Sequence, residues 1–269
     1  MMRKLFQAPL FQAPLLLAMT LSASVAAHAE TITVAAASSL QFAMPELVER
    51  FEAEHDDDVR VTFGASGNLL RQIQQGAPFE IFLSADEARA RTLEQQGLSD
   101  GEGLTYALGR LVWLQSKEHP LPDEGDPLQA VRQAIAQAQK SGTRQRFALA
   151  NPEHAPYGMA AREVLEREGL WQDSQDLRIV GENVAQAAQF SLSAEAIGGF
   201  SAYSLVTAPE LEERAAWRLI PEQWHAPLVQ RMVLVKDAGE GARSFFDFMQ
   251  SPEAGEILNR FGFSIPDTP

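Results

Sequence analysis

Four times along the chain, an apolar run ends in a short segment of small or polar residues that leads into an amphipathic segment. The first copy follows the apolar run at residues 32–34 and contains Ser38 and Ser39. The four junctions lie at residues 35–40, 64–68, 151–158 and 181–184. Each predicts a strand that ends where a helix begins, so that helix N–H groups without an intrahelical acceptor lie at a sheet edge. A serine there either caps its own helix or helps to bind an anion, and the repetition favours the anion.

Strand-like and helix-like patterns alternate along the rest of the chain. This alternation predicts an α/β fold with mainly parallel sheets. The length of 269 residues predicts about two domains. Residues 106–114 form one long strand-like run with Gly109 inside it, and residues 228–235 form another.

The N-terminus has the pattern of a secretory signal. Arg3 and Lys4 precede a mostly apolar stretch, and Ala27 and Ala29 are the small residues that a signal peptidase reads. We therefore predict a signal peptide over residues 1–29, cleavage after Ala29, and a mature protein in the periplasm that begins at Glu30. Later segments are too short or too polar to span a membrane.

The net charge of −14 restricts the partners of the chain. Such a charge argues against binding to nucleic acid and to anionic membrane surfaces. It also repels small anions, so an anion site must rely on local dipoles. The chain has no cysteine, so the core must form without disulfides. We expect a monomer.

We find no motif for catalysis or for a cofactor. The sequence has no phosphate-binding loop, nucleophile elbow or zinc-binding histidine pair. The acidic run at residues 56–58 is interpreted as a solvated turn rather than a metal site, because a second oxygen-rich cluster is missing. A triad assembled from residues far apart in the sequence is left open. The prediction is a binding protein, not an enzyme, with no cofactor and no direct metal-cation ligand.

Several motifs together resemble the molybdate-binding proteins of bacterial ABC importers. The similar segments lie at residues 34–40, 63–66, 71–73, 76–78, 82–86, 151–158, 182–184 and 260–263. They span almost the whole predicted mature chain. Together they are specific, although no single one would be.

The resemblance implies a type II periplasmic-binding-protein fold. This fold has two lobes, each with a mixed sheet flanked by helices, and two crossing hinge strands, with the ligand in the cleft. We place the crossings near residues 107–112 and 226–230. The first lobe then comprises residues 30–108 and 229–269, and the second lobe residues 109–228.

The resemblance also implies the ligand and its contacts. Members of the family hold the oxyanion with hydroxyls and backbone N–H groups, and the corresponding positions here are Ser39, Ser66, Tyr157 and Val184, with Ser38 as a neighbour. The implied ligand is molybdate or tungstate, and the implied partner is the membrane permease of an ABC importer. Two other functions are weighed: a receptor for another tetrahedral oxyanion such as sulfate or phosphate, and an α/β hydrolase.

One position differs among family members. Some have a small residue where Tyr157 stands and use a tyrosine in the tail of the glycine-rich strand near residues 197–201. That later position falls on Ala202 here, with Tyr203 beside it. Other members carry the tyrosine at the position of Tyr157, and this chain follows them. Tyr203 is then predicted to be structural.

Overall fold

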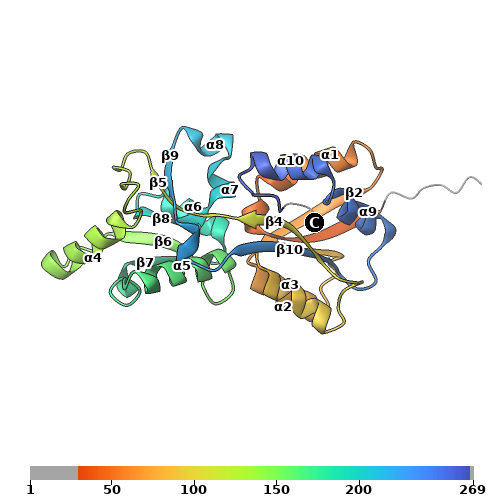
Figure 1. The fold of residues 1–269 in the computed structure, drawn as a ribbon, viewed down its shortest axis with the longest axis horizontal. Helices are drawn as coiled ribbons and strands as arrows, with labels where there is room; N and C mark the ends of the chain where they lie inside the picture. Colours follow the sequence, from red (N-terminus) through yellow and green to blue (C-terminus); the bar gives the residue numbers. More distant parts are fainter. Residues whose placement is uncertain (1–29, 267–269) are drawn as a thin grey trace, which may run out of the picture.

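The computed structural model describes residues 30–266 and shows two five-stranded sheets, one in each half of the molecule (Figure 1). The predicted signal peptide lies outside these residues. The first sheet has the order β2 (Asp58–Gly64), β1 (Thr31–Ala37), β3 (Ile81–Ser84), β10 (Leu228–Leu234) and β4 (Leu104–Gly109). The second has the order β7 (Arg178–Gly181), β6 (Arg146–Ala150), β8 (Ala196–Ala202), β5 (Leu111–Ser116) and β9 (Ala215–Leu219). We call the halves the first and second lobes.

Both sheets are mixed. In the first lobe β1 pairs in parallel with β2 and β3, whereas β10 is antiparallel to β3 and β4. In the second lobe β6 is parallel to β7 and β8, whereas β5 is antiparallel to β8 and β9. The predicted class, α/β with two lobes and two mixed sheets flanked by helices, is confirmed.

Helices cover both faces of the first sheet (Figure 1). They are α1 (Ala43–Glu52), α9 (Glu240–Phe248) and α10 (Pro252–Arg260) on one face, and α2 (Ser66–Gln74) and α3 (Glu87–Gln95) on the other. The alternation of side chains along β1 explains the two layers: Val34 packs under the first group and Ala35 under the second. Burial of these apolar faces drives the assembly of the lobe.

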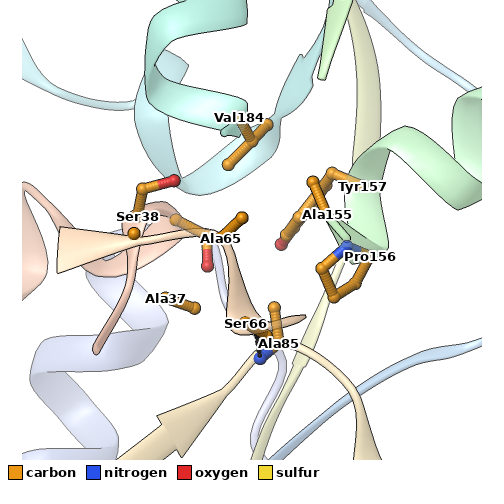
Figure 2. Close-up of a pocket in the computed structure, with 11 residues that line it drawn as sticks. Ala37, Ser38, Ala65, Ser66, Ala85, Ala155, Pro156, Tyr157 and Val184 are labelled. Carbon is orange, nitrogen blue, oxygen red and sulfur yellow. Dashed lines mark hydrogen bonds between the residues drawn. The ribbon is translucent and has the colours of Figure 1, made fainter. Parts of the chain in front are cut away.

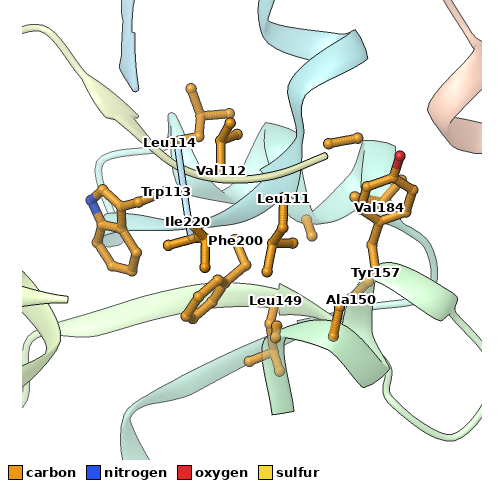
Figure 3. Packing of buried hydrophobic residues seen from close by; sticks show 14 of the residues in the cluster. Leu111, Val112, Trp113, Leu114, Leu149, Ala150, Tyr157, Val184, Phe200 and Ile220 are labelled. Carbon is orange, nitrogen blue, oxygen red and sulfur yellow. The ribbon is translucent and has the colours of Figure 1, made fainter. Parts of the chain in front are cut away.

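The second lobe has a single large core (Figure 3). Its helices are α4 (Gln129–Ser141), α5 (Pro156–Arg167), α6 (Val184–Ser191), α7 (Tyr203–Val206) and α8 (Pro209–Glu212). Trp113 is fully buried there, with Phe200 edge-on at a centroid distance of 5.7 Å and Phe147 at 6.1 Å. This core supports the start of α5, where Tyr157 lies (Figure 3).

The chain crosses between the lobes twice. The run predicted as one strand over residues 106–114 is two strands in different sheets, β4 and β5, separated only by Arg110. Gly109 ends pairing with Leu228 in the first sheet, and Leu111 begins pairing with Ala202 in the second. The chain returns between the end of β9 and the start of β10. Two sheets with different orientations require this break, which an apolar run does not reveal.

Within residues 30–266, no helix has both the length and the apolar character needed to cross a bilayer.

Candidate functional site

The five predicted site residues gather around one small cavity between the lobes (Figure 2). They are Ser38, Ser39, Ser66, Tyr157 and Val184. The other lining residues are Ala37, Gly64, Ala65, Ala85, Ala155 and Pro156. The cavity is small, with a volume of about 10 Å³ for the centre of a water-sized sphere. The cavity therefore suits a small ligand.

Three helices and one 3-10 turn begin at the cavity. The turn η1 (Ser38–Leu40) and helix α2 belong to the first lobe, and α5 and α6 belong to the second. The amides of Ser66, Tyr157 and Val184, one from each helix, lie in first turns, where N–H groups have no intrahelical acceptor. The positive ends of these helix dipoles thus converge from both lobes on a site that favours negative charge.

Two serine hydroxyls are oriented by backbone amides. Ser66 Oγ accepts a hydrogen bond from the N–H of Ala85 at 2.9 Å, and Ser38 Oγ accepts one from the N–H of Ala185 at 3.4 Å. A hydroxyl has one proton to donate and two lone pairs that accept. Because an amide already occupies an acceptor position on each oxygen, each proton remains available to a ligand.

Two other polar atoms at the cavity lack partners. Ser39 Oγ and the Tyr157 hydroxyl are buried and have no hydrogen-bond partner among the described residues. Buried polar groups are normally paired, and exceptions often mark functional positions. These two atoms come from opposite lobes and line the same cavity. They are suited to donate to a ligand between them.

The Tyr157 hydroxyl stays protonated. Burial raises its pKa above the ordinary value for tyrosine, and the nearby side chains of Ser39, Ser204 and Gln230 act in the opposite direction. None of these three neighbours meets the geometry of a hydrogen bond with the hydroxyl. At neutral pH, Tyr157 is therefore an uncharged donor.

The cavity lining contains no charged side chain. The described residues also hold no group of three acidic or histidine side chains placed to bind a metal cation. Neutral donors and helix dipoles are therefore what the cavity offers a ligand. Donors fixed in advance stabilise negative charge well, because they need little rearrangement when the ligand arrives.

The lobes touch each other directly beside the cavity. The N–H of Gly67 in α2 donates to the carbonyl of His154 at 2.9 Å. Ser204 Oγ in α7 donates to the carbonyl of Ser39 at 2.8 Å. These two bonds, with the one between Ser38 and Ala185, hold the lobes together around the cavity. The structure is therefore in a closed form.

Residues 32–264 match the family described as bacterial extracellular solute-binding protein. The chain belongs to this family. The predicted membership in a solute-binding-protein family is thereby confirmed.

This solute-binding protein is similar to characterised relatives over most of its length. It is 32% identical over 250 residues to the molybdate-binding protein of Rhodobacter capsulatus, covering 92% of this chain and 93% of the relative. The structure of the periplasmic molybdate-binding protein of Azotobacter vinelandii is similar with a TM-score of 0.77 and 29% identity, covering 88% of this chain and 100% of that one. The sulfate-binding protein SubI of Mycobacterium tuberculosis shares the fold, with a TM-score of 0.69, 14% identity and coverage of 89% and 88%.

Tyr203 and Ala202 lie outside the lining of the cavity in this solute-binding protein. The ring of Tyr203 packs edge-on against Trp217 at 4.9 Å, and Gly262 leaves room for it. Ala202 is buried in the core of the second lobe. Tyr157 is thus the tyrosine of the cavity.

Sequence reasoning missed three residues that support the cavity. Ala85 orients Ser66, Ser204 bonds the backbone of Ser39, and Gln230 lies near Tyr157. Ala85 belongs to a further strand-to-helix junction at residues 84–86, which the junction pattern could have identified. Ser204 and Gln230 come from distant segments and no local pattern marks them.

Proposed function

We propose that this protein binds molybdate in the cavity between its lobes. The observation that carries the proposal is the small, uncharged cavity between the lobes, into which serine hydroxyls, a tyrosine hydroxyl and three helix N-termini converge. Such a lining suits a tetrahedral dianion that only accepts hydrogen bonds. The relatives that are 32% identical over most of the chain are named for molybdate binding, which supports this choice among oxyanions.

The size of the cavity supports discrimination among oxyanions. Donors fixed on two lobes set the ligand radius, so sulfate, which is smaller, should satisfy fewer of them. Tungstate has nearly the same size and charge as molybdate and should bind as well. Hydrogen phosphate keeps a proton at neutral pH. Its O–H group would face an O–H or N–H group of the protein, and two donors that face each other weaken binding.

The proposed role is capture for transport. The protein would hold molybdate in the periplasm, after removal of the signal peptide, and deliver it to the membrane permease of an ABC importer. It would act as a monomer, without catalysis and without a cofactor. Membership in an extracellular solute-binding family supports this role.

Titration of the purified protein, residues 30–269, with four oxyanions tests the proposal. Calorimetry should show tight binding of molybdate and tungstate, and weaker binding of sulfate and phosphate. Tighter binding of sulfate or phosphate would instead favour the receptor for another oxyanion. A turnover screen with ester substrates tests the hydrolase alternative, and measurable turnover that depends on the cavity serines would contradict the binding role.

Replacing Tyr157 by phenylalanine tests whether the hydroxyl contacts the ligand. A hydrogen bond to a charged group contributes about 1.5–3 kcal/mol. We therefore expect molybdate affinity to fall by roughly ten- to a hundredfold, measured by calorimetry.

Tyr203→Phe is the control for this prediction and should have little effect on binding. If only the backbone N–H of Tyr157 binds the ligand, Tyr157→Phe should be nearly silent, while Ser39→Ala and Ser66→Ala still lower the affinity. A strong loss in Tyr203→Phe and none in Tyr157→Phe would mean that the tyrosine is wrongly assigned.

A further inference from the structure

A glutamine is completely buried where the strands cross between the lobes. Gln230 has no exposed surface and lies in β10, next to the cavity but not in its lining. A buried amide is costly unless its hydrogen bonds are made. Its partners therefore show what this side chain is placed to do.

A β-bulge brings Tyr106 to Gln230. Pairing of β10 with β4 passes from Gln230 opposite Ala107 to Arg231 opposite Thr105, so Tyr106 is the extra residue. Bulges redirect side chains in this way. The buried hydroxyl of Tyr106 donates to Gln230 Oε1 at 3.4 Å.

The surroundings determine which end of the Gln230 amide is the NH₂ group. One end faces the carbonyls of Leu228 at 3.3 Å and Ala85 at 3.5 Å. Carbonyl oxygens only accept, so this end must be Nε2. The Tyr106 hydroxyl at the other end then donates to Oε1. The orientation is set by these three groups and does not depend on a ligand.

The Tyr157 hydroxyl lies at the NH₂ end of Gln230. A Cβ atom added to Gly109 would clash with this hydroxyl and would lie 2.7 Å from Gln230 Nε2. The two atoms thus share the space that the missing side chain of Gly109 leaves open. Both bonds from Nε2 to backbone carbonyls are long. A small rotation of the planar amide group can therefore direct one of its two N–H groups at the tyrosine oxygen in place of the carbonyl of Ala85.

We propose that Gln230 is a positioning residue whose NH₂ group donates to the Tyr157 hydroxyl oxygen and so directs the hydroxyl proton into the cavity. The inference rests on the proposed function for the identity of the ligand. Backbone amides donate to the hydroxyl oxygens of Ser38 and Ser66. Gln230 would donate to the hydroxyl oxygen of Tyr157 in the same way, which leaves the hydroxyl proton for the ligand. No backbone amide does this for Tyr157 among the described residues.

The arrangement makes Gln230 a determinant of specificity. With the Gln230 donor on one lone pair of its oxygen, the Tyr157 hydroxyl directs its O–H toward the cavity and presents a donor to the ligand. A fully deprotonated oxyanion accepts a hydrogen bond from this hydroxyl. A protonated anion would present its own O–H to a protein donor and lose affinity.

A double-mutant cycle on Gln230 and Tyr157 tests the proposal. Gln230→Met keeps the volume of the side chain and removes the NH₂ donor. For the single variant Gln230→Met, calorimetry should show that molybdate affinity falls by about tenfold. In a Tyr157→Phe background the same substitution should change affinity by less than about twofold, because the oxygen that Gln230 orients is gone.

Gln115→Met is a matched control. Gln115 is also buried, and its amide bonds Trp113 and the carbonyls of His119 and Pro120, none of which lines the cavity. It should lower the unfolding midpoint without changing molybdate affinity. If Gln230→Met does not fold, Gln230→Glu serves instead. Its carboxylate would accept a hydrogen bond from the Tyr157 hydroxyl and repel an anion, so affinity should fall by more than in Tyr157→Phe.

Two outcomes of the variant measurements would overturn the proposal. One is an equal loss from Gln230→Met with and without the Tyr157 hydroxyl, which would mean that Gln230 acts by packing at the crossing. The other is affinity in Gln230→Glu equal to that of the parent. A wrong ligand assignment gives a different result, because the parent protein would then bind another of the four oxyanions more tightly than molybdate. The double-mutant cycle is then measured with that anion. Binding of none of them would overturn both.

Discussion

Gly67→Val should weaken molybdate binding by roughly a hundredfold while leaving the fold intact. A Cβ atom on Gly67 would lie 2.9 Å from both the Cβ and the carbonyl oxygen of His154 in the opposite lobe. Overpacking of this kind costs about 1–3 kcal/mol. The interlobe hydrogen bond from Gly67 contributes about 0.5–1.5 kcal/mol more. At about 1.4 kcal/mol per tenfold change, the middle of the summed range, about 3 kcal/mol, corresponds to roughly a hundredfold.

Small-angle scattering shows whether the loss arises from failure to close. The parent protein should become more compact when molybdate is added, as expected for hinge closure, and Gly67→Val should not. Gly255→Val is the control, because Gly255 also lies in a helix of the first lobe and its nearest neighbour would be 3.8 Å away. An unchanged affinity in Gly67→Val would contradict a closed, ligand-binding form in which Gly67 contacts His154.

Replacing Trp113 by alanine should lower the free energy of unfolding by about 3–5 kcal/mol, the range for large aromatic residues in a core. Trp113 is fully buried and packs against both Phe147 and Phe200, and Figure 3 shows it beside Phe200 in the core. Its Nε1 also donates to Gln115 Oε1 at 2.9 Å, so the substitution leaves a buried amide oxygen without this donor. Denaturant unfolding followed by circular dichroism measures the loss.

Trp224→Ala is the matched control for the stability prediction. Trp224 is only partly buried, and the guanidinium carbon of Arg167 lies 5.7 Å from the centroid of its ring. It should cost clearly less than Trp113→Ala. Equal losses from the two substitutions would contradict the central place of Trp113 in the core.

The junctions between strands and helices were readable from the sequence because each depends on neighbouring residues. An apolar run, a short polar or small segment and an apolar period of helical spacing are local patterns. The family resemblance implied that Ser39, Ser66 and Val184 contact the ligand, and the local pattern independently placed each of them where a strand ends and a helix begins. The structure places all of them at the cavity.

The rest depends on contacts between distant segments. The break at Arg110 is invisible in the apolar run around it, because both parts have strand character. Only the family resemblance indicated a crossing there, near residues 107–112. Gln230 and Tyr106 are 124 residues apart, and only a bulge in the strand pairing joins them. The contact of Gly67 with His154 depends on how the lobes meet, which residue patterns within either lobe do not determine.

The place of β10 in the first sheet has a consequence for how the chain folds. β10 lies between β3 and β4, so those two strands are not paired with each other, and both pair with a strand that comes from near the C-terminus. The five strands of the second sheet, in contrast, come from one continuous stretch that ends at Leu219. Contacts between residues far apart in sequence form slowly, because the loop between them must close first. As the chain emerges from its N-terminus onward, the second lobe can fold early, whereas the first lobe and the cavity can form only after β10 has emerged.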